Sequence, residues 1–383
     1  MCSGRQYPVE RRHFGHQQSA LEKTAEWTRR VATSLLISNE PQATPYLAHL
    51  VSHSDAIMTS FLLWRHVMPM NRVQFQPGLS MFEFLERYGT EGKCEDALSA
   101  SRWPQGWICP RCQARTAYTF RRGRQPYREC VDCRYQCSLI VGTMFEGSKL
   151  PLQVWFMAMQ LLSQAKNNVA ALELRRQLGV SYPTAWLMKH KIMEAMLQRE
   201  DDRQLSGRVE IDDAYLGGER SGGKSGRGSE NKVPFVVALQ TVAGGAPHLL
   251  CMAQLPFRRT AVAEFAAAHL VRPLTVVSDG LDCFRATAEH GVHERVVTGG
   301  GKASNELPQF RWLNTVLGNF KTALAGTYHA FKFDKYAPRY LAEVQFRFNR
   351  RYRMDHMLPR ILRALVAAGP CPEWRIRASE ASC

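Results

Sequence analysis

The chain has 383 residues, of which 45% are hydrophobic, so it is long and apolar enough for two or three packed domains. Lysine and arginine outnumber aspartate and glutamate by 50 to 34, and this excess predicts a polyanionic partner, most often a nucleic acid. The alternative is a basic protein without such a partner. No apolar run is long enough to span a membrane, and the first residues lack the apolar stretch of a secretory signal, which favours a cytoplasmic protein.

Residues 1–69 show no clear periodicity and form a predicted N-terminal extension. Orderly patterning begins at Met70, so the extension either precedes a biological start at Met70 or is an ordinary appendage. Over residues 70–100 we predict a short helical lead-in. Its segment "SMFEFLERYG" is typical of a helix with Ser80 as N-cap and Gly89 at its end.

Residues 101–148 contain two CxxC pairs, formed by Cys109, Cys112, Cys130 and Cys133. Each CxxC turn directs two thiolates at one ion, and two such turns complete a tetrahedral zinc site, which predicts a zinc ribbon. Since thiolates fill every ligand position, we expect the zinc to be structural. The segments "TAYTFRR" and "QPYREC" alternate like a small hairpin, and Cys137 is expected to pack rather than bind metal. The remaining cysteines are scattered, which favours a reducing compartment.

Several arginines crowd the predicted ribbon: Arg121, Arg122, Arg124, Arg128 and Arg134. On so small a domain they predict a basic face for contacts with phosphates. A solvated charged surface is the alternative.

Residues 149–200 are typical of helices. The segment "ALELRRQLG" ends at Gly179, and Ser181 can cap a second helix that tolerates Pro183 in its first turn. Helix, short turn and helix predict a helix-turn-helix, whose second helix would enter a major groove. The expected DNA contacts are its polar positions, Tyr182, Thr184, Lys189 and Lys191. A helical hairpin without DNA binding is the alternative.

Residues 207–355 change to an α/β pattern of three strands, helix, strand, helix, strand and helix. The predicted elements lie at 208–218, 233–242, 248–256, 260–271, 274–280, 281–291, 292–301 and 306–325. This order belongs to the ribonuclease H-like fold, a mixed sheet flanked by helices, although many α/β domains share parts of it. We therefore predict a multidomain chain with a zinc ribbon, a helix-turn-helix region and an α/β RNase H-like catalytic domain.

Carboxylates occur at two places in this domain. Alternation in the first strand places Glu210 and Asp212 on one side and Asp213 on the other, while Asp279 ends the buried strand "TVVSDG". In an RNase H-like sheet these strands are neighbours, which brings Asp212 next to Asp279. Close carboxylates repel and favour Mg²⁺, and two such ions could activate a water or a 3′-hydroxyl. The alternative is two acids that cap loops at strand ends.

The last predicted helix of the domain carries Asn314 and, seven positions later, Lys321. Two helical turns place both on one face, where Asn314 could reach the metal ions and Lys321 a phosphate. A polar stripe on a surface helix is the alternative.

Several segments resemble the DDE transposases of bacterial insertion sequences, in the group that joins an N-terminal zinc ribbon to a retroviral-integrase-like domain. The likeness runs from about Met70 to about Arg353 and is carried by "PQGWICPRC", "GTMFEGSKLPLQVWF", "ALELRRQLGVSYPTAW", "VEIDDAYLGG", "GTYHAF" and "EVQFRFNRRY". It implies a transposase that cuts at the terminal inverted repeats of its element and joins the freed 3′-hydroxyl to target DNA. Two catalytic Mg²⁺ ions, one structural Zn²⁺, DNA and a homo-oligomeric partner, and a nucleoid-associated location are implied with it.

In the family pattern, Asp212 and Asp279 match the first two catalytic acids, Asn314 the third, and Lys321 the basic residue that follows. Most transposases of the wider class have glutamate where this chain has Asn314. An amide oxygen can bind Mg²⁺ but carries no charge, so the second ion should bind less tightly.

Either Glu306 or Asp213 could supply the missing charge. The rival interpretations are a catalytically inactive DNA-binding relic or regulator, and a host nuclease of the same fold.

The segment "FKFDKYAPRYLAEVQFRFNRRYR" predicts a basic helix that holds a DNA backbone through Arg347, Arg350, Arg351 and Arg353. A solvated helix face is the alternative. Residues 356–383 are predicted to be a C-terminal tail.

Overall fold

The computed structural model describes residues 76–217, 232–242, 245–296, 307–328 and 332–378, and the statements below concern these residues. All of the described residues belong to one unit, Asn71–Cys383. The predicted extension over 1–69 therefore lies outside the described part. Among the residues described, no helix is both long and apolar enough to cross a membrane.

Two helices precede the ribbon, α3 (Met81–Tyr88) and α4 (Glu91–Arg102). The predicted N-cap is confirmed: Ser80 Oγ accepts from the Glu83 amide, and the Glu83 carboxylate accepts from the Ser80 amide, 2.9 Å away. This reciprocal pair satisfies two amide groups that a helix start would otherwise leave without a partner. Gly89 ends the helix, as expected.

The ribbon is a three-stranded antiparallel sheet of β1 (Ala117–Arg122), β2 (Gln125–Cys130) and β3 (Gln136–Ser138). The predicted hairpin is confirmed by the pairing of β1 with β2, in which Ala117 faces Cys130. A small core of Trp107, Cys109 and Cys130 lies beneath it.

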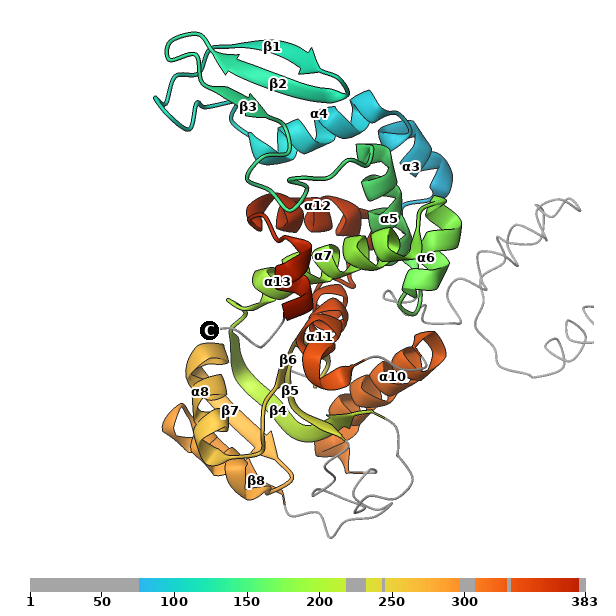
Figure 1. The fold of residues 1–383 in the computed structure, drawn as a ribbon. Coiled ribbons are helices and arrows are strands. Elements are labelled where there is room, and N and C mark those ends of the chain that lie inside the picture. Colours follow the sequence, from blue (N-terminus) through green and yellow to red (C-terminus); the bar gives the residue numbers. More distant parts are fainter. Residues whose placement is uncertain (1–75, 218–231, 243–244, 297–306, 329–331, 379–383) are drawn as a thin grey trace, which may run out of the picture. The chain divides into compact units, whose positions relative to one another are not determined.

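A larger core joins helices from both ends of the described chain (Figure 1). It contains buried residues of α3, α4, α5 (Leu152–Gln164), α6 (Ala171–Leu178), α7 (Tyr182–Glu200) and α12 (Met357–Ala367). Gly179 adopts the left-handed conformation (φ 65°) that ends α6, and Ser181 caps α7, so the predicted helix-turn-helix pattern is present.

The prediction of a C-terminal tail over 356–383 is wrong for its larger part. After the short 3-10 helix η3 (Met354–His356), α12 contributes Leu358, Ile361 and Leu365, none of which is exposed, and α13 (Glu373–Ala378) adds Ile376. Leu358, Ile361 and Leu365 are spaced by three and four residues, which places them on one apolar face of α12. That face completes the helical core.

The second half of the chain forms a mixed five-stranded sheet with the order β6-β5-β4-β7-β8. The strands are β4 (Leu205–Leu216), β5 (Val233–Thr241), β6 (Pro247–Gln254), β7 (Leu270–Ser278) and β8 (Val292–Arg295). The first three pair antiparallel, whereas β7 is parallel to both β4 and β8. This is the arrangement typical of an RNase H-like fold, as predicted.

Helices cover both faces of the sheet. On one face α8 (Arg259–His269) and the 3-10 helix η1 (Asp282–Glu289) pack on alternate residues of the strands. On the other face lie α10 (Arg311–Thr327), which follows the 3-10 turn η2 (Pro308–Phe310), and α11 (Phe333–Asn349). Because α11 also packs against α7, the predicted boundary between 149–200 and 207–355 is not a gap between independent domains (Figure 1).

Candidate active site

The register of two strands brings the predicted acids together. Ile211 of β4 pairs with Ser278, the last residue of β7, so the next residues, Asp212 and Asp279, are neighbours. A carboxylate oxygen from each of Asp212, Asp213 and Asp279 lies within 4.8 Å of the others, and all three residues are half-buried. The expected proximity of Asp212 and Asp279 is confirmed.

Local hydrogen bonds hold the turn that carries Asp279. Its Oδ1 accepts from the Leu281 amide at 3.0 Å, and the Ser278 hydroxyl accepts from the Gly280 amide at 3.3 Å. Gly280 has φ 93°, a conformation that favours glycine. Ser278 Oγ also lies 2.9 Å from His293 Nε2 on β8, which ties this turn to the neighbouring strand. These hydrogen bonds fix the turn after β7 and, with it, the position of the Asp279 carboxylate.

Asp213 reaches the same point from the other face of β4. Ala214 and Leu216 pack under α10 and α11, whereas Val209 and Ile211 pack under α8. Alternation therefore assigns Asp212 and Asp213 to opposite faces, as predicted. The third carboxylate of the cluster is thus an aspartate of β4, and Asp213 is one of the two residues expected to compensate for Asn314. The other, Glu306, lies outside the described residues.

Glu210 lies on the same face of β4 as Asp212, but it is not a member of the carboxylate cluster. It is 3% exposed, and Arg208 is its nearest cation, with 3.7 Å between Nη2 and Oε1. Burial raises the pKa of Glu210 to about 7, against the opposing influence of Arg208 and of a hydrogen bond from the Leu313 amide. Sequence reasoning gave Glu210 no role, because the helix that buries it lies about a hundred positions later.

Asn314 and Lys321 lie on α10, which packs against β4. The amide of Leu313, which precedes Asn314, bonds to Glu210, two residues before Asp212 on the strand. Asn314 is half-buried there, and Lys321 is exposed two turns further along the helix.

The donor set fits a hard divalent cation. Carboxylate oxygens are the ligands that Mg²⁺ prefers, and two oxygens bound to one ion are separated by roughly 3–4 Å. The three carboxylates already lie within 4.8 Å, so a small closure would bring them to such distances. Asn314 could add a neutral amide oxygen from α10.

The four ribbon cysteines form a second metal-binding group. Their sulfur atoms all lie within 4.8 Å of one another, with Cys109 Sγ 3.6 Å from Cys133 Sγ and Cys112 Sγ 3.4 Å from Cys130 Sγ. A tetrahedral zinc site with bonds of about 2.3 Å has edges of about 3.8 Å. The cysteines therefore fit one zinc ion. Cys137 is buried outside this group, as predicted, and its thiol donates to the Ser138 carbonyl.

Both CxxC turns have the same backbone. The Cys109 amide donates to the Ala114 carbonyl at 2.8 Å, and the Cys130 amide donates to the Tyr135 carbonyl at 2.9 Å. The residue after each pair, Gln113 or Arg134, has a positive φ of 66° or 58°. Two copies of one turn thus present the thiolates from opposite sides.

The structure corrects the prediction that Lys189 contacts DNA. This lysine is 1% exposed because α7 is enclosed by neighbouring helices, and its ammonium lies 3.6 Å from Glu343 Oε2 of α11. Burial lowers the pKa of Lys189, and Glu343 opposes that effect. Lys191 is also buried and donates to the Met144 carbonyl. At the start of α7, Tyr182 is 45% exposed and Thr184 is half-buried in the cap, and at its other end Gln198 and Arg199 are exposed.

The predicted DNA contacts of the basic helix are largely internal as well. Arg350 is buried and pairs with the buried carboxylate of Glu200, so its prediction as a DNA contact is wrong. Arg351 donates to the backbone carbonyls of Pro247 and His248 and thereby fastens the start of β6. Arg353 is exposed beside Asp355, 3.2 Å away.

Several ribbon arginines also have partners within the protein. Arg121 pairs with Glu95 of α4, Arg128 donates to Ser99, and Arg134 pairs with Glu129. The exposed Arg124 and Arg122 remain on the outer surface of the ribbon. Arg121 and Arg134 are exposed too, but their charges are paired with Glu95 and Glu129.

Fold and site together define a class of protein, in which an RNase H-like domain with carboxylates at the strand edge follows a four-cysteine ribbon. Residues 204–349 match the family model described as an ISXO2-like transposase domain, and residues 89–136 match the one described as a transposase zinc-ribbon domain. The chain therefore carries a transposase zinc ribbon followed by an ISXO2-like DDE transposase domain.

A protein of Halobacterium salinarum, described as an uncharacterized protein in transposable element ISH50, is similar to this chain. The two are 28% identical over 238 residues, which is 58% of this chain and 79% of that protein. No solved structure matches the chain.

Proposed function

We propose that the chain is a transposase that binds the terminal inverted repeats of its own element and catalyses metal-dependent strand cleavage and strand transfer. The observation that carries the proposal is the cluster of Asp212, Asp213 and Asp279 at the strand edge of a domain that matches a transposase family. A homo-oligomer is part of the proposal, since two element ends must be held at once.

In this proposal Asp212 and Asp279 are the charged ligands of two Mg²⁺ ions, and Asn314 is an uncharged auxiliary ligand. Bound Mg²⁺ would supply activation of a water or 3′-hydroxyl and stabilisation of the leaving oxygen in an in-line phosphoryl transfer. Asp213 adds negative charge to the site and offsets the neutral amide of Asn314. Lys321, exposed on α10, holds a DNA phosphate near the carboxylates.

The test is cleavage and joining of oligonucleotides that carry the element's ends, in the presence of Mg²⁺. Wild type should cut and join, whereas Asp279→Ala and Asn314→Ala should each lose activity about a hundredfold or more. If wild type is inert and Asn314→Glu restores cleavage, the chain is a DNA-binding relic instead. Cleavage without preference for the ends and without joining would favour a nuclease.

A further inference from the structure

A groove of about 620 Å³ lies beside α10, between the segment that joins α5 to α6 and the C-terminal part of α11. Its lining includes three cations, Lys166, Arg347 and Arg351, and among the described residues no aspartate or glutamate. Three amide side chains that can donate to an anion lie with them: Asn167, Asn168 and Asn319. Lys166, Asn167, Asn319 and Thr322 are exposed.

The positive charge of this groove is not neutralised by the contacts that its arginines make. Arg347 donates to the side-chain oxygen of Asn168, 2.9 Å away, and to the Ala165 carbonyl. Arg351 donates to the carbonyls of His248 and Phe348, at 3.0 and 2.8 Å. All of these partners are neutral, so they orient the guanidinium groups without cancelling their charge. An arginine remains protonated in such a place.

The groove also lies on a different side of α10 from the residues proposed for catalysis. At 100° per residue, Asn319 is roughly 140° around the helix axis from Asn314. Lys321 is likewise on the far side from Asn319, by roughly 160°. A ligand in the groove would therefore be separated from the carboxylate cluster by the helix itself.

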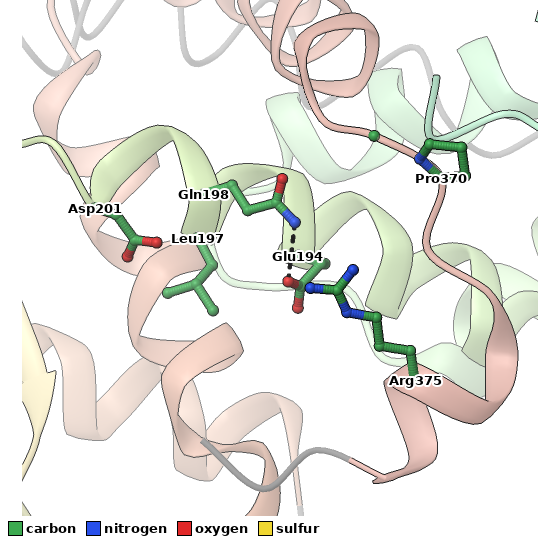
Figure 2. A pocket seen from close by; sticks show the side chains of 7 residues that line it. Glu194, Leu197, Gln198, Asp201, Pro370 and Arg375 are labelled. Atoms are coloured by element: carbon green, nitrogen blue, oxygen red, sulfur yellow. Dashed lines mark hydrogen bonds between the residues drawn. The ribbon is translucent and has the colours of Figure 1, made fainter. Parts of the chain in front are cut away.

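A second hollow differs from the groove in the charges of its lining (Figure 2). It has a volume of about 330 Å³ and is lined by Glu194, Asp201 and Arg375, among others. Gln198 donates to Glu194 there, at 3.1 Å. Glu194 is paired with Arg339, 2.7 Å away, which leaves Asp201 against Arg375, so this hollow has no excess of positive charge for a polyanion.

We propose that the groove beside α10 binds the phosphodiester backbone of DNA, at a second contact apart from the one at the carboxylate cluster. The proposal deepens the proposed function, since it assumes that DNA is the partner. The exposed Lys166 makes a direct charge contact, Arg347 and Arg351 supply a fixed positive field, and the exposed amides of Asn167 and Asn319 donate to phosphate oxygens.

The first test is DNA affinity as a function of salt. The full chain is titrated onto a fluorescently labelled duplex of random sequence, and the slope of log affinity against log salt is compared between wild type and Lys166→Ala. Loss of one phosphate contact should reduce the slope by about 0.9 and weaken binding about fivefold to tenfold at about 0.1 M salt. The matched control is Arg363→Ala, which also removes an exposed cation, from α12 and outside the groove.

The proposal would be overturned if wild type and Lys166→Ala had the same slope of log affinity against log salt. It would also be overturned if Lys166→Ala and Arg363→Ala lost the same amount of DNA affinity. A photo-crosslinking amino acid placed at Asn319 provides a readout independent of charge, since it should couple to the duplex whereas the same amino acid at Arg363 should not. Lack of a crosslink at Asn319 would also reject it. The comparison is repeated with Asp279→Ala in both the reference chain and the Lys166→Ala chain, where DNA cleavage is not expected, so failure of the groove and failure of catalysis are seen in separate experiments.

Discussion

Lys189 of α7 and Glu343 of α11 form an ion pair inside the protein, with Nζ and Oε2 3.6 Å apart and each side chain 1% exposed. The Lys189 ammonium also donates to the Val169 carbonyl at 2.6 Å and lies 4.5 Å from the centre of the Tyr328 ring. The pair therefore joins the helix-turn-helix region to the two helices that cover the sheet.

Removal of one partner should destabilise the protein strongly. Lys189→Met or Glu343→Leu leaves an uncompensated buried charge, and we expect each to lower the free energy of unfolding by about 3–5 kcal/mol. The double variant removes both charges and should lie close to wild type. Urea unfolding measures all three, and single variants as stable as wild type would contradict the arrangement. DNA affinity of the double variant should be unchanged, because Lys189 does not reach the surface.

Glu210 should make stability depend on pH. Because folding raises its pKa from 4.5 to about 7, the protonated form is favoured in the folded state. The stabilising contribution is fully present below the unfolded pKa and is lost as the pH rises through about 7. Glu210→Gln, which cannot ionise, should therefore raise the free energy of unfolding at pH 8 by up to about 3 kcal/mol.

The measurement is the difference in unfolding free energy between Glu210→Gln and wild type at about pH 5 and pH 8. The control is Glu289→Gln, which replaces an exposed glutamate. The difference in unfolding free energy between this variant and wild type should be the same at both pH values. A Glu210→Gln difference that does not grow between them would show that Glu210 ionises freely in the folded chain.

Zinc content distinguishes the ligand cysteines from Cys137. Cys133→Ser breaks the four-sulfur group and should lose most of the bound zinc, together with the fold of the ribbon. Cys137→Ser should keep one zinc per chain, since its sulfur lies outside that group. Zinc per chain is measured by elemental analysis after dialysis, and loss of zinc from Cys137→Ser would reject the assignment.

The burial of α12 can be tested by truncating one side chain. Ile361→Ala removes a fully buried side chain from the helical core and should cost about 2–5 kcal/mol of stability. The neighbouring exposed Arg363→Ala should change stability by less than about 0.5 kcal/mol. Thermal unfolding of the two variants decides whether this segment is a core helix, and similar midpoints would restore the interpretation as a tail.

Local patterns predicted much of the fold, because they depend on residues that are near one another in the sequence. The CxxC spacing predicted the ribbon, and alternation with a terminal acid predicted the neighbouring positions of Asp212 and Asp279. The amphipathic spacing of "MLPRILRALVA" was available as well, and it would have predicted α12.

The failed predictions concern side chains whose partners are distant in the sequence. Lys189 and Arg350 have the residue types of DNA contacts, but Glu343 and Glu200, which neutralise them, lie about 150 positions away in each case. Burial and ion pairing of a basic residue are tertiary properties, and neither composition nor helical periodicity contains them. The raised pKa of Glu210 has the same origin, since α10 covers it.

The helical core that begins with Leu79 is closed by Ile376, so its two ends are separated by nearly the whole described chain. During synthesis the first helices leave the ribosome without α12, and their apolar faces stay uncovered until α12 and α13 have been made. Completion of this core must therefore await the synthesis of α12 and α13, and its non-local contacts predict slow folding. A prematurely terminated chain would keep its ribbon and sheet sequences but expose an apolar surface, which would direct it to aggregation or proteolysis.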